Sequence, residues 1–345
     1  MIELRRILTN ANVSSLIRAK SNQKRQILAL PPSATVETAL ICFIENDITA
    51  IPIMSEHGAL PESVFGVLLI VDVLNFLLID APDDLHKNHA TRLLREPLAQ
   101  IMKCQELHQL NVVEDRIALI DVLLKYWNPT EDKENQLDPL ATNYHLLVKC
   151  TTDRMQWSII TPTDLLRYVM FYGQKSDFLQ HTFIDDLDRQ YSLFIKWASV
   201  KKVHVDEEAW KAFQEVSHTL HSDLVAVVDT GNNALMAHVS SRDFLPASSN
   251  DLKNMVLALR MQGNSLLSYL CAIKNVSSGA ATHVMLDPVL LRENYTLHDV
   301  LGKMIGGRAH HLWRVKGSDH ANVPIGVVGI RNLIHVIAQV VRSAI

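Results

Sequence analysis

Two short stretches combine a hydroxyl and a carboxylate at the same spacing, Thr161 with Asp164 in TPTD and Ser240 with Asp243 in SSRD. A Ser or Thr three residues before an acidic residue is typical of a helix N-cap, where both side chains bond to the first turn. The same pair could also bind a ligand at the positive end of a helix. The carboxylate can accept both hydroxyls of a ribose diol, and the hydroxyl can donate to a phosphate oxygen. For either stretch alone, capping is the simpler interpretation.

Both stretches end a unit that occurs four times along the chain. Each unit has apolar residues at helical spacing, then two strand-like runs, and then the start of a second helix. From the first apolar helical residue to the final acidic position, the distance is 36 residues in the first unit (36 to 72), 34 in the third (209 to 243) and 35 in the fourth (297 to 332). The second unit takes 45 residues (119 to 164). Its surplus matches the polar segment 128–142, which we predict to be an inserted surface loop.

The four endings are not equivalent. They read GVLLIVD (66–72), SIITPTD (158–164), AHVSSRD (237–243) and GVVGIRN (326–332). Asp72 keeps the carboxylate of the first ending, but Leu69 replaces its hydroxyl. Gly329 and Asn332 replace both groups in the fourth, and an Asn can bond to a ribose only without charge assistance. We therefore expect two complete sites, a third partial site at Asp72, and a fourth that is empty or altered.

These endings resemble the G-h-h-[ST]-x-x-D ending of the CBS domain, the cystathionine-β-synthase repeat, where h is apolar. Four such units in one chain resemble the γ subunit of AMP-activated protein kinase and its fungal and plant relatives. The resemblance implies an α/β (α+β) fold, with four CBS repeats arranged as two tandem (Bateman) modules in a disc. In that family the Asp binds the ribose, the Ser or Thr is directed toward the phosphate, and adenine lies in an apolar cleft between paired repeats.

The γ subunits also place His-Arg pairs just before the first strand of some repeats. Here no arginine stands at that place, and the first repeat has Ile48-Thr49 there. Histidines occupy it in the other three repeats: His145 in the second, His221 in the third, and His310 and His311 in the fourth. Imidazole is mostly uncharged near neutral pH, so we expect weaker phosphate binding than in a γ subunit. The alternative is that these histidines only pack or face solvent.

Other basic residues near the endings are Arg167, Arg242 and Arg331. We expect Arg242 and Arg331 to face solvent. Apolar residues over 255–270, including Met255 and Leu266, predict one amphipathic helix that packs on the fourth repeat.

Composition shifts set the expected organisation of the chain. The predicted parts are a basic N-terminal segment (1–30), repeat 1 (31–80), repeat 2 (97–170), a linker between modules (171–200), repeat 3 (201–247), a helical linker (248–280) and repeat 4 (281–345).

The whole-chain properties exclude several classes of protein. A net charge of −4 gives no basic footprint for nucleic acid. The sequence contains no run of 18 apolar residues, so it predicts no membrane span. The N-terminus also lacks a secretory hydrophobic region. The sequence has no metal-binding His/Cys spacing, phosphate loop or nucleophile elbow. The four cysteines contain no CxxC pair, which favours a reducing compartment. We therefore expect a cytoplasmic protein, with the nucleus as a further location.

The sequence therefore predicts a regulatory protein that is not an enzyme and requires no cofactor. It would bind AMP, ADP or ATP and act as an energy sensor on a Ser/Thr protein kinase complex of catalytic and scaffold subunits. The alternative is a CBS-repeat scaffold for protein interactions that has lost nucleotide binding, which the altered fourth ending and the missing arginines favour. The sequence leaves open whether the protein forms a homodimer.

Overall fold

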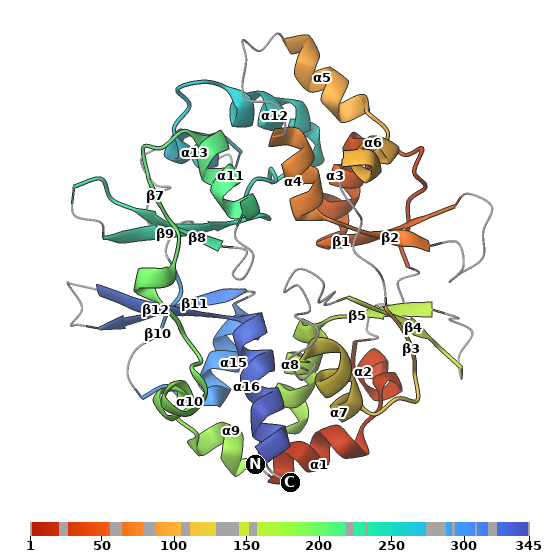
Figure 1. The fold of residues 1–345 in the computed structure, drawn as a ribbon, viewed down its shortest axis with the longest axis vertical. Coiled ribbons are helices and arrows are strands. Elements are labelled where there is room, and N and C mark those ends of the chain that lie inside the picture. Colours follow the sequence, from red (N-terminus) through yellow and green to blue (C-terminus); the bar gives the residue numbers. More distant parts are fainter. Residues whose placement is uncertain are drawn as a thin grey trace, which may run out of the picture. The chain divides into compact units, whose positions relative to one another are not determined.

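The computed structural model describes most of the chain as helices, strands and their connections (Figure 1). The described residues are 2–20, 27–55, 64–78, 87–104, 111–128, 145–151, 157–218, 224–231, 234–273, 288–291, 294–307, 309–316 and 323–343. The predicted loop insertion falls mainly on 129–144, and the predicted turn of the first repeat falls on 56–58, so both lie outside the described residues.

The described elements form four copies of one unit, which confirms the predicted repeat. Each copy opens with a short strand or bridge that pairs parallel with the following strand. A helix comes next, then two strands that pair antiparallel with each other. The opening strand was not predicted because its two to four residues are too few to show alternation.

The copies contain the following elements. Repeat 1 has a bridge from Leu30 to Ile53, then α3 (Val36–Asn46), β1 (Ala50–Met54), β2 (Val64–Leu69) and α4 (Ile70–Leu78). Repeat 2 has β3 (Asn111–Glu114), α7 (Leu119–Val122) with the π-helical turn η1 (Leu123–Trp127), β4 (Leu146–Lys149), β5 (Trp157–Ile160) and α8 (Pro162–Tyr172). Repeat 3 has β7 (Lys202–His204), α11 (Ala209–His218), β8 (Leu224–Val228) and β9 (Leu235–Ser240). Repeat 4 has β10 (Leu290–Leu291), α15 (Leu297–Gly306), β11 (His311–Lys316), β12 (Val323–Gly329) and α16 (Ile330–Ser343).

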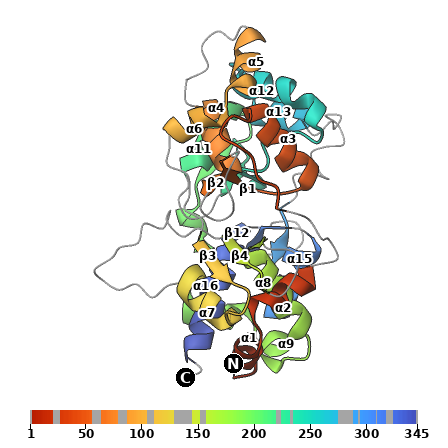
Figure 2. The same cartoon turned by 90° about the vertical axis from the view of Figure 1, so that its right-hand side faces the viewer.

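The chain divides into two compact units that combine repeats which are not adjacent in sequence. Unit 1 comprises Met1–Ile27, Leu110–Val200 and Val289–Ile345, and so contains repeats 2 and 4. Unit 2 comprises Leu28–Gln109 and Lys201–Pro288, and so contains repeats 1 and 3. Each unit has its own hydrophobic core. Within each unit the helices gather on one side of the strands (Figure 1 and Figure 2).

This grouping differs from the expected pairs of consecutive repeats, because the helices bury their apolar faces against a non-adjacent repeat. In unit 1, α8 packs against α15 and α16, and in unit 2, α4 packs against α11. The predicted linker 171–200 forms the end of α8, α9 (Asp177–His181), α10 (Ile184–Tyr191), β6 (Ile195–Lys196) and η3 (Trp197–Ser199), all within unit 1. The chain passes from unit 1 to unit 2 at the end of this linker, between Val200 and Lys201.

The connecting helices nevertheless relate the repeats in consecutive pairs. Helix α2 (Val13–Lys20) precedes repeat 1 but packs on α8 of repeat 2, and α6 (Leu98–Cys104) precedes repeat 2 but packs on α4 of repeat 1. In the same way, α10 precedes repeat 3 but packs on α16, and α13 (Leu266–Ile273) precedes repeat 4 but packs on α11. Repeats 1 and 2 thus exchange helices, as do repeats 3 and 4. This exchange is compatible with tandem modules, whose arrangement in a disc stays a prediction.

Equivalent bridges fix each exchanged helix. In each repeat, the residue just before the first helix pairs with the residue just before the exchanged helix that packs on that repeat. These bridges join Thr35 to Pro97, Asn12 to Ala118, Glu208 to Ser265 and Phe183 to Thr296. Within the predicted N-terminal segment, α2 therefore packs with repeat 2, and α1 (Ile2–Asn10) packs on α7, α8 and α16. Leu30, at the end of that segment, instead bridges to Ile53 of repeat 1.

The helical linker before repeat 4 differs from its prediction. Instead of one helix over 255–270, it forms η4 (Ser249–Asp251), α12 (Leu252–Arg260) and α13. Gly263, at φ 70°, lies in the turn between α12 and α13, a conformation that glycine adopts readily. Both helices pack on α11, in repeat 3 rather than in repeat 4.

Candidate functional site

The Thr161/Asp164 pair caps α8 and also gathers other polar groups. The Asp164 amide donates to Oγ1 of Thr161 at 3.4 Å, and the Thr161 amide donates to Oδ2 of Asp164 at 2.9 Å. These two bonds form a capping box, with Pro162 at the first helical position, where a missing N–H costs nothing. The Thr161 hydroxyl also donates to Oδ2 at 3.0 Å. The capping interpretation is therefore confirmed for this copy.

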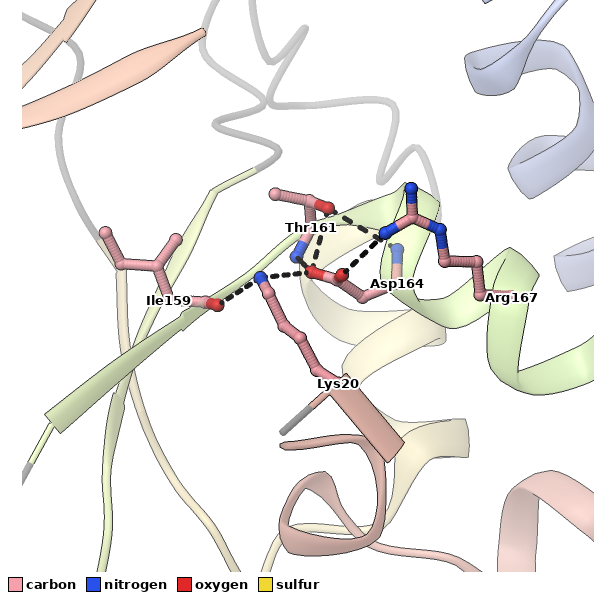
Figure 3. A network of polar contacts seen from close by, with 5 residues as sticks. All are labelled: Lys20, Ile159, Thr161, Asp164 and Arg167. Carbon is pink, nitrogen blue, oxygen red and sulfur yellow. Dashed lines mark hydrogen bonds and ion pairs between the residues drawn. The ribbon is translucent and has the colours of Figure 1, made fainter. Parts of the chain in front are cut away.

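Two cations flank the same carboxylate, as Figure 3 shows. The Lys20 ammonium, from the last turn of α2, donates to Oδ2 of Asp164 at 2.9 Å and to the Ile159 carbonyl at 3.1 Å. The Arg167 guanidinium lies 3.9 Å from the other oxygen, Oδ1. The Asp164 side chain is only 5% exposed, whereas those of Lys20 and Arg167 are 42% and 55% exposed. The site thus holds more positive than negative charge.

Lys20 is the residue that the sequence analysis missed. It lies 144 positions from Asp164, and no spacing within a repeat relates the two residues. The only signal in the sequence was the basic character of the segment that contains it. The exchange of α2 onto repeat 2 is what brings the ammonium to the carboxylate.

One hydrogen bond is common to all four endings. The backbone N–H at the hydroxyl position donates to the side-chain oxygen three residues later in every copy. The bonds are Leu69 to Asp72 at 2.7 Å, Thr161 to Asp164 at 2.9 Å, Ser240 to Asp243 at 2.8 Å and Gly329 to Asn332 at 2.9 Å. The Asn of the fourth copy therefore keeps the turn, and what it lacks is the charge.

The Ser240/Asp243 pair has the same turn in a different setting. The Ser240 hydroxyl donates to Oδ2 of Asp243 at 2.7 Å, but a turn follows instead of the expected helix. Pro246 lies three residues after Asp243, has no N–H and disfavours helical backbone at the residue before it. The expectation that both complete pairs lie at a helix N-terminus is therefore wrong for the third repeat, and this pair lacks that dipole.

The carboxylate of Asp243 is also less occupied than that of Asp164. Asp243 is half-buried, and within the described part of the chain its Oδ1 accepts no hydrogen bond. His238, two residues before Ser240 on β9, interacts electrostatically with the Asp243 carboxylate. Burial lowers the pKa of His238, and the Asp243 carboxylate acts in the opposite direction. The repeat 3 pair therefore offers an anionic oxygen for a ligand.

A buried hydroxyl supports the backbone just after Asp243. Tyr269, on α13, is fully buried, and its hydroxyl donates to the Phe244 carbonyl at 2.7 Å. Burial raises the pKa of Tyr269 well above its usual value, so the hydroxyl stays a donor. The rings of Phe213 and Phe244 complete an aromatic cluster around it. A second exchanged helix thus supports a second candidate site.

The histidines predicted to bind phosphate divide into two groups. His311 pairs with Gly329 across the β11–β12 hairpin, and continuing the β4–β5 register by one residue places His145 opposite Thr161. Directly opposed residues of an antiparallel pair have their side chains on the same face. These two histidines therefore share a position next to the hydroxyl site, whereas His310 is exposed and precedes the strand.

The equivalent residues in the other two repeats are not those expected. Ala50 is opposite Leu69 in repeat 1, and Leu224 is opposite Ser240 in repeat 3. The structural counterpart of His311 is therefore Leu224 rather than His221, which lies outside the described residues, and Ala50 rather than Thr49. The two complete pairs consequently differ, since Thr161 has an opposing histidine and Ser240 has a leucine.

Gly329 lies close against the His311 ring. A Cβ added at residue 329 would lie 3.0 Å from Cδ2 and 3.2 Å from Nε2 of that ring. The imidazole thus takes up the space into which a Ser or Thr side chain would extend. The fourth site combines an imidazole with the Asn332 amide, and so has no carboxylate for a diol.

Arg242, expected to face solvent, forms an ion pair with Asp47. Asp47 ends α3 in the left-handed conformation, just before β1. This pair ties the Ser240–Asp243 turn of repeat 3 to repeat 1 within unit 2. Arg242 therefore has a structural contact that competes with a role toward a phosphate.

The described residues offer neither a metal site nor a membrane-spanning helix. They contain no group of three or more His, Cys, Asp or Glu side chains that could hold a metal ion. In the same residues no helix has the length and apolar character needed to cross a membrane.

Comparison with known proteins identifies the repeat. The family model of the CBS domain matches residues 23–79. None of the curated proteins compared with the chain matches it.

Among solved structures, the chain is similar to a protein of Methanocaldococcus jannaschii described as a proposed archaeal homolog of γ-AMPK. The identity is 16%, the TM-score is 0.57, and the match covers 90% of this chain and 96% of that one. The chain also matches an uncharacterized conserved protein of Pyrococcus horikoshii, with 15% identity and a TM-score of 0.45. This match covers 90% of this chain and 96% of that one. CBSX2, solved in complex with AMP, matches 47% of this chain and 98% of its own, with 15% identity and a TM-score of 0.28. Residues 23–79 are therefore a CBS domain, and the chain as a whole has the CBS-repeat fold.

Proposed function

We propose that this protein binds an adenine nucleotide at its Ser240/Asp243 and Thr161/Asp164 turns and regulates a partner protein without catalysing a reaction. The observation that carries the proposal is the shared turn, which holds a carboxylate beside a hydroxyl at the end of a strand in both repeats. Oδ1 of Asp243, which accepts no hydrogen bond from the described residues, could accept one from a hydroxyl of the ribose. The Ser240 hydroxyl would then turn from Asp243 to a phosphate oxygen.

The proposed partner is a Ser/Thr protein kinase complex, for which the protein would act as an energy sensor. The likeness in fold to the archaeal protein described as a homolog of γ-AMPK supports this part of the proposal. Binding of AMP, ADP or ATP would shift the population of conformations toward those that bind the kinase more or less tightly. Isolation of the protein from native extract, followed by mass spectrometry, tests for kinase subunits among its partners.

Titration calorimetry with AMP, ADP and ATP tests the binding itself. The informative variants are Asp243→Asn and Asp164→Asn, because Asn332 shows that an amide oxygen preserves the turn. We expect each variant to lose binding at its own repeat while remaining folded.

The chain offers a matched control in the capping box of α15. Thr296 and Asp299 form the same three bonds as Thr161 and Asp164, but at the first helix of a repeat rather than at the end of its hairpin. Asp299→Asn should therefore leave the binding heat unchanged. A folded wild-type protein that gives no heat with any of the three nucleotides would favour the alternative, a scaffold for protein interactions. The Lys20 ammonium already bound to Asp164 is the observation that favours this alternative.

A further inference from the structure

Lys20 is positioned as part of the repeat 2 site by a rigid set of contacts. Asn12 caps α2, and its Oδ1 accepts bonds from the Ser15 amide at 3.1 Å and the Ser14 hydroxyl at 2.8 Å. The Val13 and Ser14 amides donate to the Ile117 and Asp115 carbonyls of repeat 2 at 3.0 and 2.8 Å. Helix α2 also packs on α8, the helix that Thr161 caps. The last turn of α2 is therefore held next to the carboxylate.

The Lys20 ammonium uses an oxygen that a ligand would need. Oδ2 of Asp164 already accepts bonds from the amide and hydroxyl of Thr161, and Lys20 supplies a third donor. Among the described residues, the partner of Oδ1 is the Arg167 guanidinium, at 3.9 Å. A diol that bonds to both oxygens must therefore displace a donor from Oδ2, and Lys20 is the only one of the three that does not belong to the cap. The side chain of Lys20 is 42% exposed, so it can move by rotation about its own bonds.

The surplus of positive charge decides which diol can do this. With Asp164 counted as −1 and Lys20 and Arg167 as +1 each, the site has a net charge of +1. When a neutral diol displaces Lys20, the Lys20–Asp164 ion pair is lost and the ammonium gains no new anion. A phosphorylated ligand supplies a new anion for the displaced ammonium, and charged hydrogen bonds are the stronger ones.

We infer that Lys20 makes the repeat 2 site selective for phosphorylated ribosides over uncharged nucleosides. It competes with the ribose for Asp164 and then binds the phosphate of the ligand that displaces it. This inference rests on the proposed function, since it assigns a role to Lys20 in that same nucleotide site. Within the described part of the chain no lysine or arginine pairs with Asp243, so the Ser240/Asp243 copy should discriminate less.

The test compares AMP with adenosine in wild type, Lys20→Met and Lys20→Arg, with a probe that reports repeat 2 alone. The probe is the 13C-labelled methyl group of Thr161, assigned through Thr161→Ser, which removes the methyl and keeps the hydroxyl. In wild type we expect AMP to shift this signal at much lower concentration than adenosine. In Lys20→Met, adenosine should bind more tightly and the ratio of the two affinities should fall about tenfold. Lys20→Arg should retain the wild-type preference.

Other outcomes would overturn the inference in distinguishable ways. If the Thr161 methyl responds and the affinity ratio is the same in wild type and Lys20→Met, Lys20 has no role in selectivity, while the proposed function stands. If only Lys20→Met responds, Lys20 is a permanent occupant that blocks the site. If neither protein responds, Thr161 and Asp164 form a cap and no site. Calorimetry on the same samples then separates nucleotide binding at Ser240/Asp243 from complete failure of the proposed function.

Discussion

The His311 ring lies opposite Gly329 across the β11–β12 hairpin, so closely that a Cβ on residue 329 would be 3.0 Å from the ring. In the second repeat the corresponding residues are His145 and Thr161. A histidine at this position therefore stands opposite a threonine in one repeat and would crowd any side chain opposite it in the other. The loss of the hydroxyl in repeat 4 is thus a matter of packing as well as of chemistry.

Restoring a hydroxyl at residue 329 should destabilise unit 1. Gly329→Ser forces the His311 ring to move, and overpacking of this kind costs about 1–3 kcal/mol in the free energy of unfolding. Urea denaturation measures the loss, and a second substitution, His311→Ala, should recover part of it. Gly306→Ser is the control, because a Cβ at residue 306 meets no atom within 4 Å. Equal effects of the two serine substitutions would contradict the packing explanation.

The two complete hydroxyl–carboxylate pairs should differ in what they contribute to stability. Thr161→Ala removes the acceptor for the Asp164 amide at the start of α8, which should cost about 1 kcal/mol in unfolding free energy. Ser240→Ala removes a hydroxyl that donates to Asp243 and precedes a turn, so it should cost less. The midpoints of urea unfolding for the two variants compare these costs. A larger loss for Ser240→Ala would mean that the third-repeat turn depends on its hydroxyl as a cap.

Removal of the Tyr269 hydroxyl should weaken unit 2 without leaving a large cavity. Tyr269→Phe leaves the Phe244 carbonyl without its buried donor, which costs about 1–3 kcal/mol. Because Phe244 follows Asp243, the variant should also weaken any nucleotide binding at repeat 3. Unfolding and calorimetry on the same sample measure both effects. Tyr191→Phe is a suitable control, since the Tyr191 hydroxyl lies on the surface, where it contacts the Ser343 hydroxyl at 3.5 Å.

His238 should make unit 2 less stable as the pH falls. Burial lowers the pKa of His238 in the folded protein below its unfolded value of about 6.5, with the Asp243 carboxylate acting in the opposite direction. Above the unfolded pKa both states are neutral at this residue, and no penalty arises. As the pH falls below about 6.5 the unfolded state takes up the proton first, so stability decreases until the folded pKa is reached.

A variant with no titratable group at residue 238 isolates this effect. The free energy of unfolding should decrease less in His238→Asn than in wild type between about pH 7.5 and about pH 5.5, which lie above and below the unfolded pKa of histidine. Urea midpoints at the two pH values give the comparison. A decrease of equal size in both proteins would show that other histidines or carboxylates cause it.

The sequence by itself determined the repeat. The spacing of apolar residues and the shared ending predicted four helix–strand–strand units, and it identified Thr161 with Asp164 and Ser240 with Asp243 as the complete copies. These features depend on residues a few positions apart, where periodicity and capping rules act directly, and on the recurrence of the same pattern along the chain. The same local rules failed at Ser240, because Pro246 ended the expected helix before it began.

Tertiary structure decided which groups meet at each site. Nothing local relates Lys20 to Asp164 or Tyr269 to Phe244, and in each case an exchanged connecting helix carries the first residue to the second. The grouping of repeats 1 with 3 and 2 with 4 in compact units likewise follows from which helical faces bury one another. Hydrophobic burial has no direction along the chain, so the partner of an apolar face cannot be inferred from its spacing. The charge at the repeat 2 site, and with it the choice of ligand, therefore depends on the fold.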